Sequence, residues 1–215
     1  MRDNNSCAPG QPGVYPGDCE LTSGLLARAS SRMENNERGY AWRNCFAKAR
    51  EVKLLLLDVD GVLTDGSISY TDEGIEVKTF HVRDGFGMNL LRRAGVEIGL
   101  ITARSSAALT RRVQDLNISH VFQGRRKKVE VYEELIGRLH LDPAQVAYMG
   151  DDWLDLALLN RVGFSATVAD AVTEVRETVD YVARRPGGKG AVREVCDLII
   201  DAKGLYQELL DGYLL

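Results

Sequence analysis

Two carboxylates one residue apart, Asp58 and Asp60, directly follow four consecutive leucines at residues 54–57. The apolar run predicts a strand buried on both faces, as in a parallel sheet, and ligands of open α/β sheets bind at the carboxyl ends of such strands. A carboxylate there can attack phosphorus while a divalent cation offsets its repulsion from the phosphate oxygens. The segment therefore suits metal-assisted phosphoryl transfer, although a strand that merely ends in a polar turn would use the same residue types.

Two further strand-like runs end in groups that can hold phosphate. Residues 96–101 lead to Thr102, whose hydroxyl can bind a phosphate oxygen, and residues 120–123 precede a helix that begins near Lys128. An ammonium group at a helix start can neutralise phosphate charge, and the positive end of the helix dipole adds to its effect. Taken singly, each residue has an ordinary structural explanation as a turn or surface residue.

A fourth strand-like run, residues 145–150, ends in Asp151 and Asp152, with Asp155 one helical turn beyond. Such carboxylates suit a cation site made of hard oxygen ligands, although they would also serve as a helix N-cap. The order of the four sites along a series of alternating strands and helices is the informative feature. It predicts that they meet at one edge of a sheet as a phosphate and metal site.

Longer motifs surround these sites and carry a family resemblance. They are Asp58–Gly66, Arg83–Gly87, Gln123 and Gly124 with Lys128, Gly150–Asp152, and the segment Gly187–Cys196 that begins Gly-Gly-Lys-Gly. The four catalytic motifs resemble those of the haloacid dehalogenase superfamily of phosphotransferases. Over about residues 50–205 the chain is most similar to the 3-deoxy-D-manno-octulosonate 8-phosphate (Kdo 8-phosphate) phosphatases, which act in the making of lipopolysaccharide. It departs from many relatives at Ala103, where they have Gly, and in its first fifty residues.

The resemblance implies a two-step hydrolysis that requires Mg²⁺. Asp58 would form an aspartyl-phosphate, and Asp60 would protonate the departing sugar oxygen and then accept a proton from water. The metal would be held by the Asp58 carboxylate, the Asp60 carbonyl and Asp151. Thr102 and Lys128 would bind phosphate oxygens.

Five other residues receive supporting roles by the same resemblance. Asp152 and Asp155 would orient Lys128 or the metal-bound waters. Gly61 belongs to the backbone turn that would hold phosphate, while Arg104 and Lys189 are candidates for binding an anionic sugar acid.

The sequence also predicts how the site is covered. Apolar residues alternate with polar ones on both sides of residues 72–74, which predicts a β-hairpin flap, and the flap runs almost directly into residues 83–87. The interval from Lys128 to Asp151 holds only one helix and one strand, so no space remains for a cap domain. Because the chemistry needs water kept out, we expect neighbouring subunits to close the site, and the resemblance implies a homotetramer in which the glycine-rich loop reaches a neighbour.

The whole pattern predicts an α/β fold, a doubly wound, Rossmann-like parallel sheet with a flap and no cap domain. The 215 residues, 45% of them hydrophobic, predict one catalytic domain at 41–215 after a mobile extension at 1–40. A net charge of −4 without a basic, aromatic stripe argues against nucleic-acid binding, and no membrane-length apolar run or signal peptide is present, which favours a cytoplasmic protein. The four cysteines and three histidines are scattered, so we expect neither a zinc site nor disulfides.

Three other functions fit parts of the pattern. A phosphatase of the same fold could act on another nonulosonate or sugar-acid phosphate. A phospho-accepting receiver domain also combines Asp, Thr and Lys, but its acceptor lies at the third strand rather than the first. A non-catalytic oligomerisation module would not need both Asp58 and Asp60.

Overall fold

The computed structural model describes residues 39–214, and residues Asn44–Leu215 form one compact unit that contains the whole sheet. Two short helices, α2 (Tyr40–Asn44) and α3 (Phe46–Glu51), precede the first strand. The mobile extension predicted for residues 1–40 lies outside the described residues, apart from Gly39 and Tyr40.

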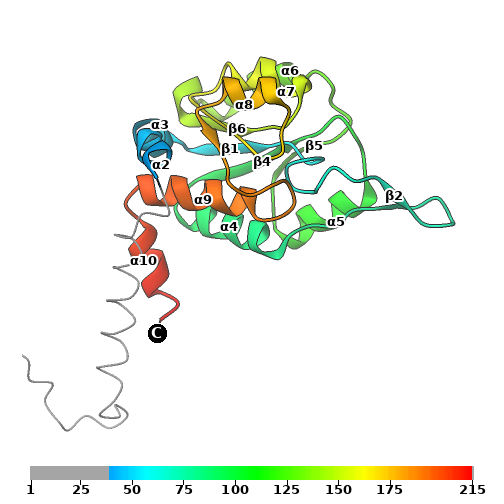
Figure 1. Cartoon of the computed structure of the whole chain (residues 1–215), viewed down its shortest axis with the longest axis horizontal. Coiled ribbons are helices and arrows are strands. Elements are labelled where there is room, and N and C mark those ends of the chain that lie inside the picture. The colour runs from blue at the N-terminus through cyan, green and yellow to red at the C-terminus, as the bar shows by residue number, and fades with distance from the viewer. Residues whose placement is uncertain (1–38, 215) are drawn as a thin grey trace, which may run out of the picture. The chain divides into compact units, whose positions relative to one another are not determined.

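A six-stranded parallel sheet forms the centre of this unit, which confirms the predicted fold class (Figure 1). The strand order is β5-β4-β1-β6-β7-β8, so the chain reverses its direction of winding on the two sides of β1. All four leucines of β1 are fully buried, as expected for a central strand covered on both faces. The strands are β1 (Leu54–Leu57), β4 (Glu97–Ile101), β5 (His120–Phe122), β6 (Val146–Met149), β7 (Phe164–Thr167) and β8 (Tyr181–Val182).

Helices cover both faces of the sheet (Figure 1). One face carries α4 (Val82–Arg93), α5 (Ala107–Asp115) and α9 (Ala191–Ala202). The other carries α6 (Lys128–Leu139), α7 (Trp153–Leu159) and α8 (Thr173–Thr178), and a short 3₁₀ turn, η1 (Pro143–Gln145), leads into β6. Two helices end the described chain: α9 stops before Gly204, whose φ of +74° cannot continue a helix, and α10 (Tyr206–Asp211) follows.

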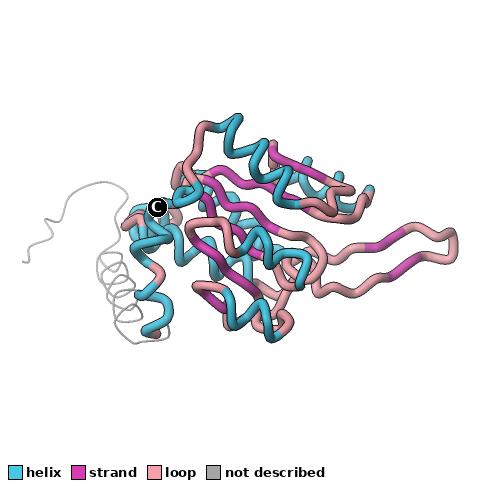
Figure 2. The backbone as a smooth tube through the Cα atoms, turned by 90° about the horizontal axis from the view of Figure 1, so that it is seen from above, coloured by secondary structure: helices cyan, strands magenta, loops and turns pink. Residues whose placement is uncertain are grey.

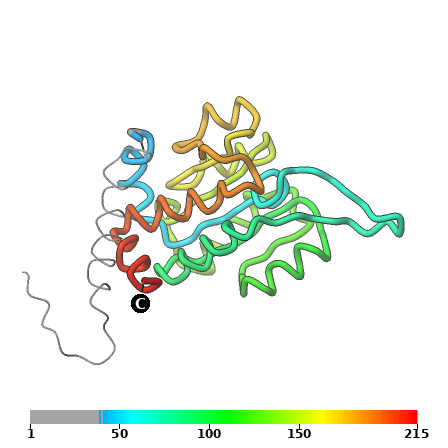
Figure 3. Tube along the Cα trace, turned by 60° about the horizontal axis from the view of Figure 1, so that its bottom comes forward, coloured from blue at the N-terminus to red at the C-terminus, as the bar shows by residue number. Residues whose placement is uncertain are grey.

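The predicted flap is a hairpin that projects from the sheet edge where β1 ends (Figures 2 and 3). Its strands, β2 (Ser69–Tyr70) and β3 (Glu76–Val77), pair antiparallel, with Ser69 opposite Val77. The flap exposes Ile68, Tyr70, Ile75 and Val77. Because α4 begins at Val82, only four residues separate it from β3, which confirms that no cap domain is inserted there.

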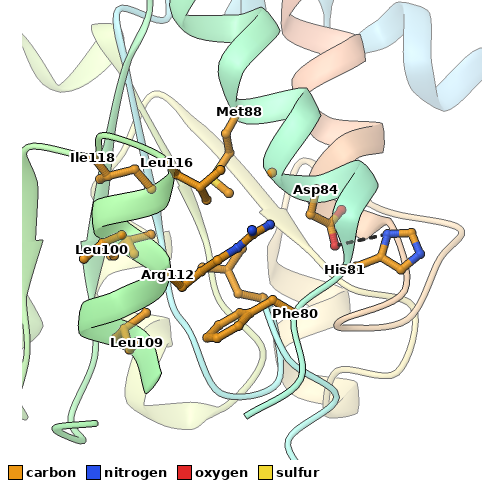
Figure 4. A pocket seen from close by; sticks show the side chains of 12 residues that line it. Phe80, His81, Asp84, Met88, Leu100, Leu109, Arg112, Leu116 and Ile118 are labelled. Carbon is orange, nitrogen blue, oxygen red and sulfur yellow. Dashed lines mark ion pairs between the residues drawn. The ribbon is translucent and has the colours of Figure 1, made fainter. Parts of the chain in front are cut away.

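The Arg83–Gly87 motif has a structural role in joining α4 to α9. Asp84 is almost fully buried, and its carboxylate accepts the backbone N–H groups of Gly190 and Arg193 at 3.3 and 2.8 Å, so it caps α9 from a neighbouring helix. Figure 4 shows the small hollow beside it, where Arg112 extends from α5 toward α4 next to Phe80. A Cβ atom on Gly85 would lie 2.4 Å from the Arg112 guanidinium, so a larger residue there would require the Arg112 side chain to move.

Candidate active site

The strand register brings the predicted catalytic residues to one edge of the sheet. Leu57, the last residue of β1, pairs with Leu100 of β4 on one side and Met149 of β6 on the other. The residues after these partners are therefore neighbours, and the Asp58 N–H donates to the Met149 carbonyl at 2.9 Å. The carboxyl ends of β1, β4 and β6 thus bring together Asp58, Thr102 and Asp151, at the point where the winding direction reverses.

Lys128 lies at the centre of this edge, although it comes from the helix after β5. Its side chain is 2% exposed, and its ammonium lies 2.9 Å from Asp58 Oδ1 and 2.7 Å from Asp155 Oδ1. Burial alone would lower the pKa of Lys128, but the negative charges of Asp58 and Asp155 outweigh burial and raise it. The group is therefore a permanent cation beside Asp58, where a phosphate would approach.

Asp155 holds this lysine in place. Its Oδ1 also accepts the Tyr148 hydroxyl at 2.5 Å, and its Oδ2 accepts the backbone N–H groups of Asp151 and Asp152 at 3.0 and 3.3 Å. A Cβ on Gly150 would lie 2.4 Å from the Asp155 carboxyl carbon, so glycine is needed for this approach. Asp152 itself is exposed and caps α7 by accepting the Trp153 N–H at 2.7 Å.

Carboxylate oxygens of Asp58, Asp151 and Asp155 lie within 4.8 Å of one another. Asp155 already accepts four hydrogen bonds, so Asp58 and Asp151 are the groups left to bind a cation. Burial, with the repulsion of nearby carboxylates added, raises the pKa of Asp58 to about 6 and that of Asp151 to about 7. Two crowded carboxylates, held charged only at a cost, fit a hard divalent cation such as Mg²⁺.

Gly61 makes the turn after the carboxylate pair possible. Its φ is +92°, and a Cβ there would lie 2.0 Å from Asp151 Oδ2. The turn is tied together because the Val59 carbonyl accepts the N–H groups of Leu63 and Thr64 at 2.9 and 3.0 Å. The backbone of this turn therefore passes directly against Asp151, which only glycine permits.

Thr102 is 2% exposed at the end of β4, and its hydroxyl oxygen accepts the Arg104 N–H at 3.2 Å. A hydroxyl that accepts one bond still has its own proton to donate, so Thr102 can serve a phosphate oxygen. Arg104 lies beyond it, with its side chain 40% exposed, and donates to Glu76 Oε1 of the flap at 2.5 Å. The hydrogen bond from Arg104 lowers the pKa of Glu76, so this pair is charged.

The flap contributes two residues that the sequence analysis did not select, Glu76 and Lys78. Lys78 is 3% exposed and forms an ion pair with Asp60 Oδ1, and its ammonium lies 3.6 Å from Glu76. Arg104 Nε lies 3.9 Å from the other oxygen of Asp60. The alternation that predicted the hairpin contained the signal, because Glu76 and Lys78 are the polar positions on the face opposite Ile75 and Val77.

The glycine-rich loop lies against the catalytic turn of its own chain. A Cβ on Gly187 would lie 1.8 Å from the Gly61 carbonyl oxygen, and Gly188, with a φ of +61°, donates its N–H to the Val62 carbonyl at 3.0 Å. Lys189 is 56% exposed, and its ammonium lies 3.8 Å from Asp65 Oδ2. The glycines therefore allow two backbone segments to touch, and Lys189 lies at the rim of the site.

A buried Asp-Lys-Asp cluster at the carboxyl ends of a doubly wound parallel sheet, with a flap after the first strand, is the arrangement of a haloacid dehalogenase-like hydrolase. Residues 117–192 match the family described as haloacid dehalogenase-like hydrolase. This span contains Lys128, Asp151 and Asp155 but not the β1 motif.

Relatives that span most of the chain narrow the assignment. The 3-deoxy-D-manno-octulosonate 8-phosphate phosphatases of Escherichia coli K12 and Yersinia pestis are both 43% identical to it, over 75% and 77% of this chain, and each alignment covers 86% of the relative. A crystal structure of the Moraxella catarrhalis phosphatase, in complex with magnesium, phosphate and KDO, is 39% identical, with a TM-score of 0.77 over 79% of this chain and 98% of the other. The chain belongs to the Kdo 8-phosphate phosphatase family, which confirms the resemblance seen in the sequence.

Proposed function

We propose that this protein is a Mg²⁺-dependent phosphatase that hydrolyses Kdo 8-phosphate to Kdo and phosphate, as a step in making a lipopolysaccharide precursor. The observation that carries the proposal is the cluster of Asp58, Lys128 and Asp151 in a chain 43% identical to enzymes of that name. The cluster is suited to the hydrolysis of a phosphate ester, and the relatives are named as phosphatases of one such ester, Kdo 8-phosphate.

In the proposed mechanism, Asp58 attacks phosphorus and forms an aspartyl-phosphate, while Asp60 protonates the departing sugar oxygen. Asp60 then accepts a proton from the water that releases phosphate. Thr102 and Lys128 hold phosphate oxygens, together with backbone amides of the Gly61 turn. Asp58, Asp151 and the Asp60 carbonyl would hold Mg²⁺, which when bound offsets the repulsion between the carboxylates and the phosphate.

Supporting positions are part of the same proposal. Asp155 keeps Lys128 in place through the 2.7 Å ion pair, and Asp152 caps the helix that carries Asp155. Arg104 binds the carboxylate of the sugar acid, which requires it to exchange Glu76 for the substrate. Lys189 adds a second cation at the rim.

A comparison of substrates tests the assignment. We expect kcat/KM for Kdo 8-phosphate to exceed that for simple hexose phosphates, because only the sugar acid offers a carboxylate to Arg104 and Lys189. Nonulosonate 9-phosphates are the sharper control, since they share the carboxylate but differ in length. A higher kcat/KM with a nonulosonate 9-phosphate would move the assignment to the alternative substrate class within the same fold.

We also propose that the protein is a homotetramer that works in the cytoplasm. The exposed apolar residues of the flap support an assembly because they offer a surface that a neighbouring subunit can cover. Within residues 39–214 no helix is long and apolar enough to cross a bilayer. Light scattering of the purified protein tests the tetramer, and a monomer that is fully active would contradict it.

The glycine-rich loop contacts the catalytic turn of its own chain. Donation of this loop to a neighbouring subunit remains a prediction. Lys189→Ala subunits mixed with Asp58→Asn subunits should regain activity if a neighbour's Lys189 serves an intact Asp58. Mixed oligomers no more active than the separate variants would instead assign Lys189 to its own site.

A further inference from the structure

Four charged side chains form a closed ring at the base of the flap: Asp60, Lys78, Glu76 and Arg104. Their charges alternate, with Lys78 against Asp60, Glu76 3.6 Å from Lys78, Arg104 2.5 Å from Glu76, and Arg104 Nε 3.9 Å from Asp60. When Asp60 is ionised the four charges cancel, and each member has an opposite charge on both sides. We call these four residues the flap ring.

Lys78 stands out within an otherwise exposed hairpin. Ile75 and Val77 are 61% and 46% exposed, whereas the Lys78 side chain is 3% exposed. Removing an ammonium from water is costly unless it is paired, so the hydrophobic effect does not explain why this lysine turns inward. Its pairing with Asp60 does, and the flap is therefore tied to the proposed acid by a charge.

The two oxygens of Asp60 have different surroundings. Oδ1 accepts from Lys78, whereas Oδ2 is buried and makes no hydrogen bond with any of residues 39–214. Arg104 Nε, which lies 3.9 Å from Oδ2, is buried and also makes no hydrogen bond within the described chain. Buried polar atoms are normally satisfied, so this gap is where a substrate oxygen would find a partner.

We propose that Lys78 is a positioning residue for Asp60: by binding Oδ1 it fixes the carboxyl group so that Oδ2 exchanges the proton with the substrate. This inference rests on the proposed function, in which Asp60 is the acid and base. In the first step the Oδ2 proton moves to the sugar oxygen as its bond to phosphorus breaks and the bond from Asp58 to phosphorus forms. In the second step water attacks phosphorus, its proton moves to Oδ2, and the bond between Asp58 and phosphorus breaks.

The test uses two leaving groups that differ in their need for a proton. A sugar alkoxide needs protonation to leave, whereas para-nitrophenolate leaves without it. Release of the leaving group is measured in a single turnover, so that the second step does not interfere. We expect Lys78→Met to slow release from Kdo 8-phosphate about 10-fold to 100-fold and release from para-nitrophenyl phosphate less than about threefold.

Controls separate positioning from a general loss of structure. Lys48→Met removes another paired lysine, 2.5 Å from Asp180, and should leave both rates unchanged. Lys78→Arg keeps a positive charge for Asp60, so its rates of release from both substrates should be close to those of the wild type. The inference would be overturned if Lys78→Met slowed release from both substrates equally. It would also be overturned if Lys78→Arg did so in a protein that melts at the same temperature as the wild type.

A double-variant cycle gives the sharpest outcome. If Lys78 acts only through Asp60, Asp60→Asn combined with Lys78→Met should be no slower on Kdo 8-phosphate than Asp60→Asn alone. Losses that multiply would overturn the inference while leaving Asp60 as the acid. An Asp60→Asn variant that slows both substrates equally in the first turnover would contradict the acid role itself, and with it the positioning role.

Discussion

The strand-end cluster of Asp58, Lys128, Tyr148 and Asp155 and the flap ring face the same site but are built in different ways. Side chains in the cluster come from a central strand end, β6 and two helix starts, and both Lys128 and Asp155 are at most 2% exposed. The flap ring depends on a hairpin with two-residue strands, and its side chains range from 3% to 40% exposed. Only Asp60 belongs to both the β1 motif and the flap ring.

This difference separates two parts of the reaction. Attack on phosphorus is the same for every phosphate monoester, and the groups proposed for it are fixed by the sheet and by a saturated set of hydrogen bonds. Departure of the alcohol and recognition of its carboxylate vary with the substrate, and the groups proposed for these steps are held by ion pairs at the base of the flap.

The largest effect is expected from Asp58→Asn. An amide cannot attack phosphorus, so turnover of every phosphate ester should fall to background, whatever its leaving group. Steady-state assays with Kdo 8-phosphate and para-nitrophenyl phosphate measure this. Substantial activity with either substrate would show that Asp58 is not the nucleophile. The strand-end cluster would then not account for attack on phosphorus.

Gly61→Ala should damage the metal site with little change in the flap. The new Cβ would meet Asp151 Oδ2 at 2.0 Å, and we expect the Mg²⁺ concentration for half-maximal activity to rise about 10-fold to 100-fold. Gly74→Ala is the matched control, because Gly74 has a similar positive φ, +78°, with nothing within 4 Å of the added Cβ. An equal rise in the Mg²⁺ concentration needed by both variants would show that backbone strain, not the clash with Asp151, is responsible.

Arg104→Ala should act on recognition more than on chemistry. Loss of a charged hydrogen bond to the substrate carboxylate should raise KM for Kdo 8-phosphate about 10-fold, with little change for para-nitrophenyl phosphate. Glu76→Gln, which weakens the competing pair but keeps Arg104, should not raise KM. An equal rise for both substrates would place Arg104 in phosphate binding and remove the distinction between the two regions.

The smallest effect concerns the stability of the metal-free protein. The folded pKa values of about 7 for Asp151 and about 6 for Asp58 lie above the ordinary value of 3.8, so the stability these groups contribute is present at low pH and is lost as pH rises toward 7. Bound Mg²⁺ should reverse this loss. We expect the rise in Tm caused by Mg²⁺ to be larger at pH 8 than at pH 5, and Asp151→Asn should reduce that difference.

A pH-independent Tm increase with Mg²⁺ would contradict this assignment of the metal ligands.

Chelation of Mg²⁺ should also stop turnover, and Ca²⁺ should inhibit because its larger, looser coordination misplaces the attacking oxygen. Full activity in a chelator would remove the metal from the mechanism.

Much of the strand-end cluster could be predicted because it follows from local pattern. Four leucines in a row predict a central strand, and the alternation of strands and helices predicts that successive strand ends lie on one edge. Asp58, Thr102 and Asp151 are placed by that rule alone. The flap could be predicted as a hairpin from the alternation around Gly74, but not which of its faces turns inward.

The residues that the sequence analysis missed depend on long-range contacts. Tyr148 reads as one more apolar strand residue, yet its hydroxyl lies 3.1 Å from Lys128 and 2.5 Å from Asp155. The glycine-rich loop was predicted to serve a neighbouring subunit, and its contact with Gly61 is set by a separation of more than 120 residues. No periodicity or spacing within one segment encodes such a meeting.

The sequence by itself determined the class of fold, the order of the catalytic motifs and the oxygen and ammonium groups available for phosphate and metal, because these follow from backbone propensity, hydrophobic pattern and residue type. Tertiary structure alone decided which of these groups already have hydrogen-bond partners within the described chain and which do not. Asp155 accepts hydrogen bonds from four donors and so orients Lys128, whereas Asp60 keeps one buried oxygen that accepts no hydrogen bond from the described residues. The physical reason is that hydrogen bonds and ion pairs form over a few ångströms, and only the folded chain brings residues from different elements within that distance.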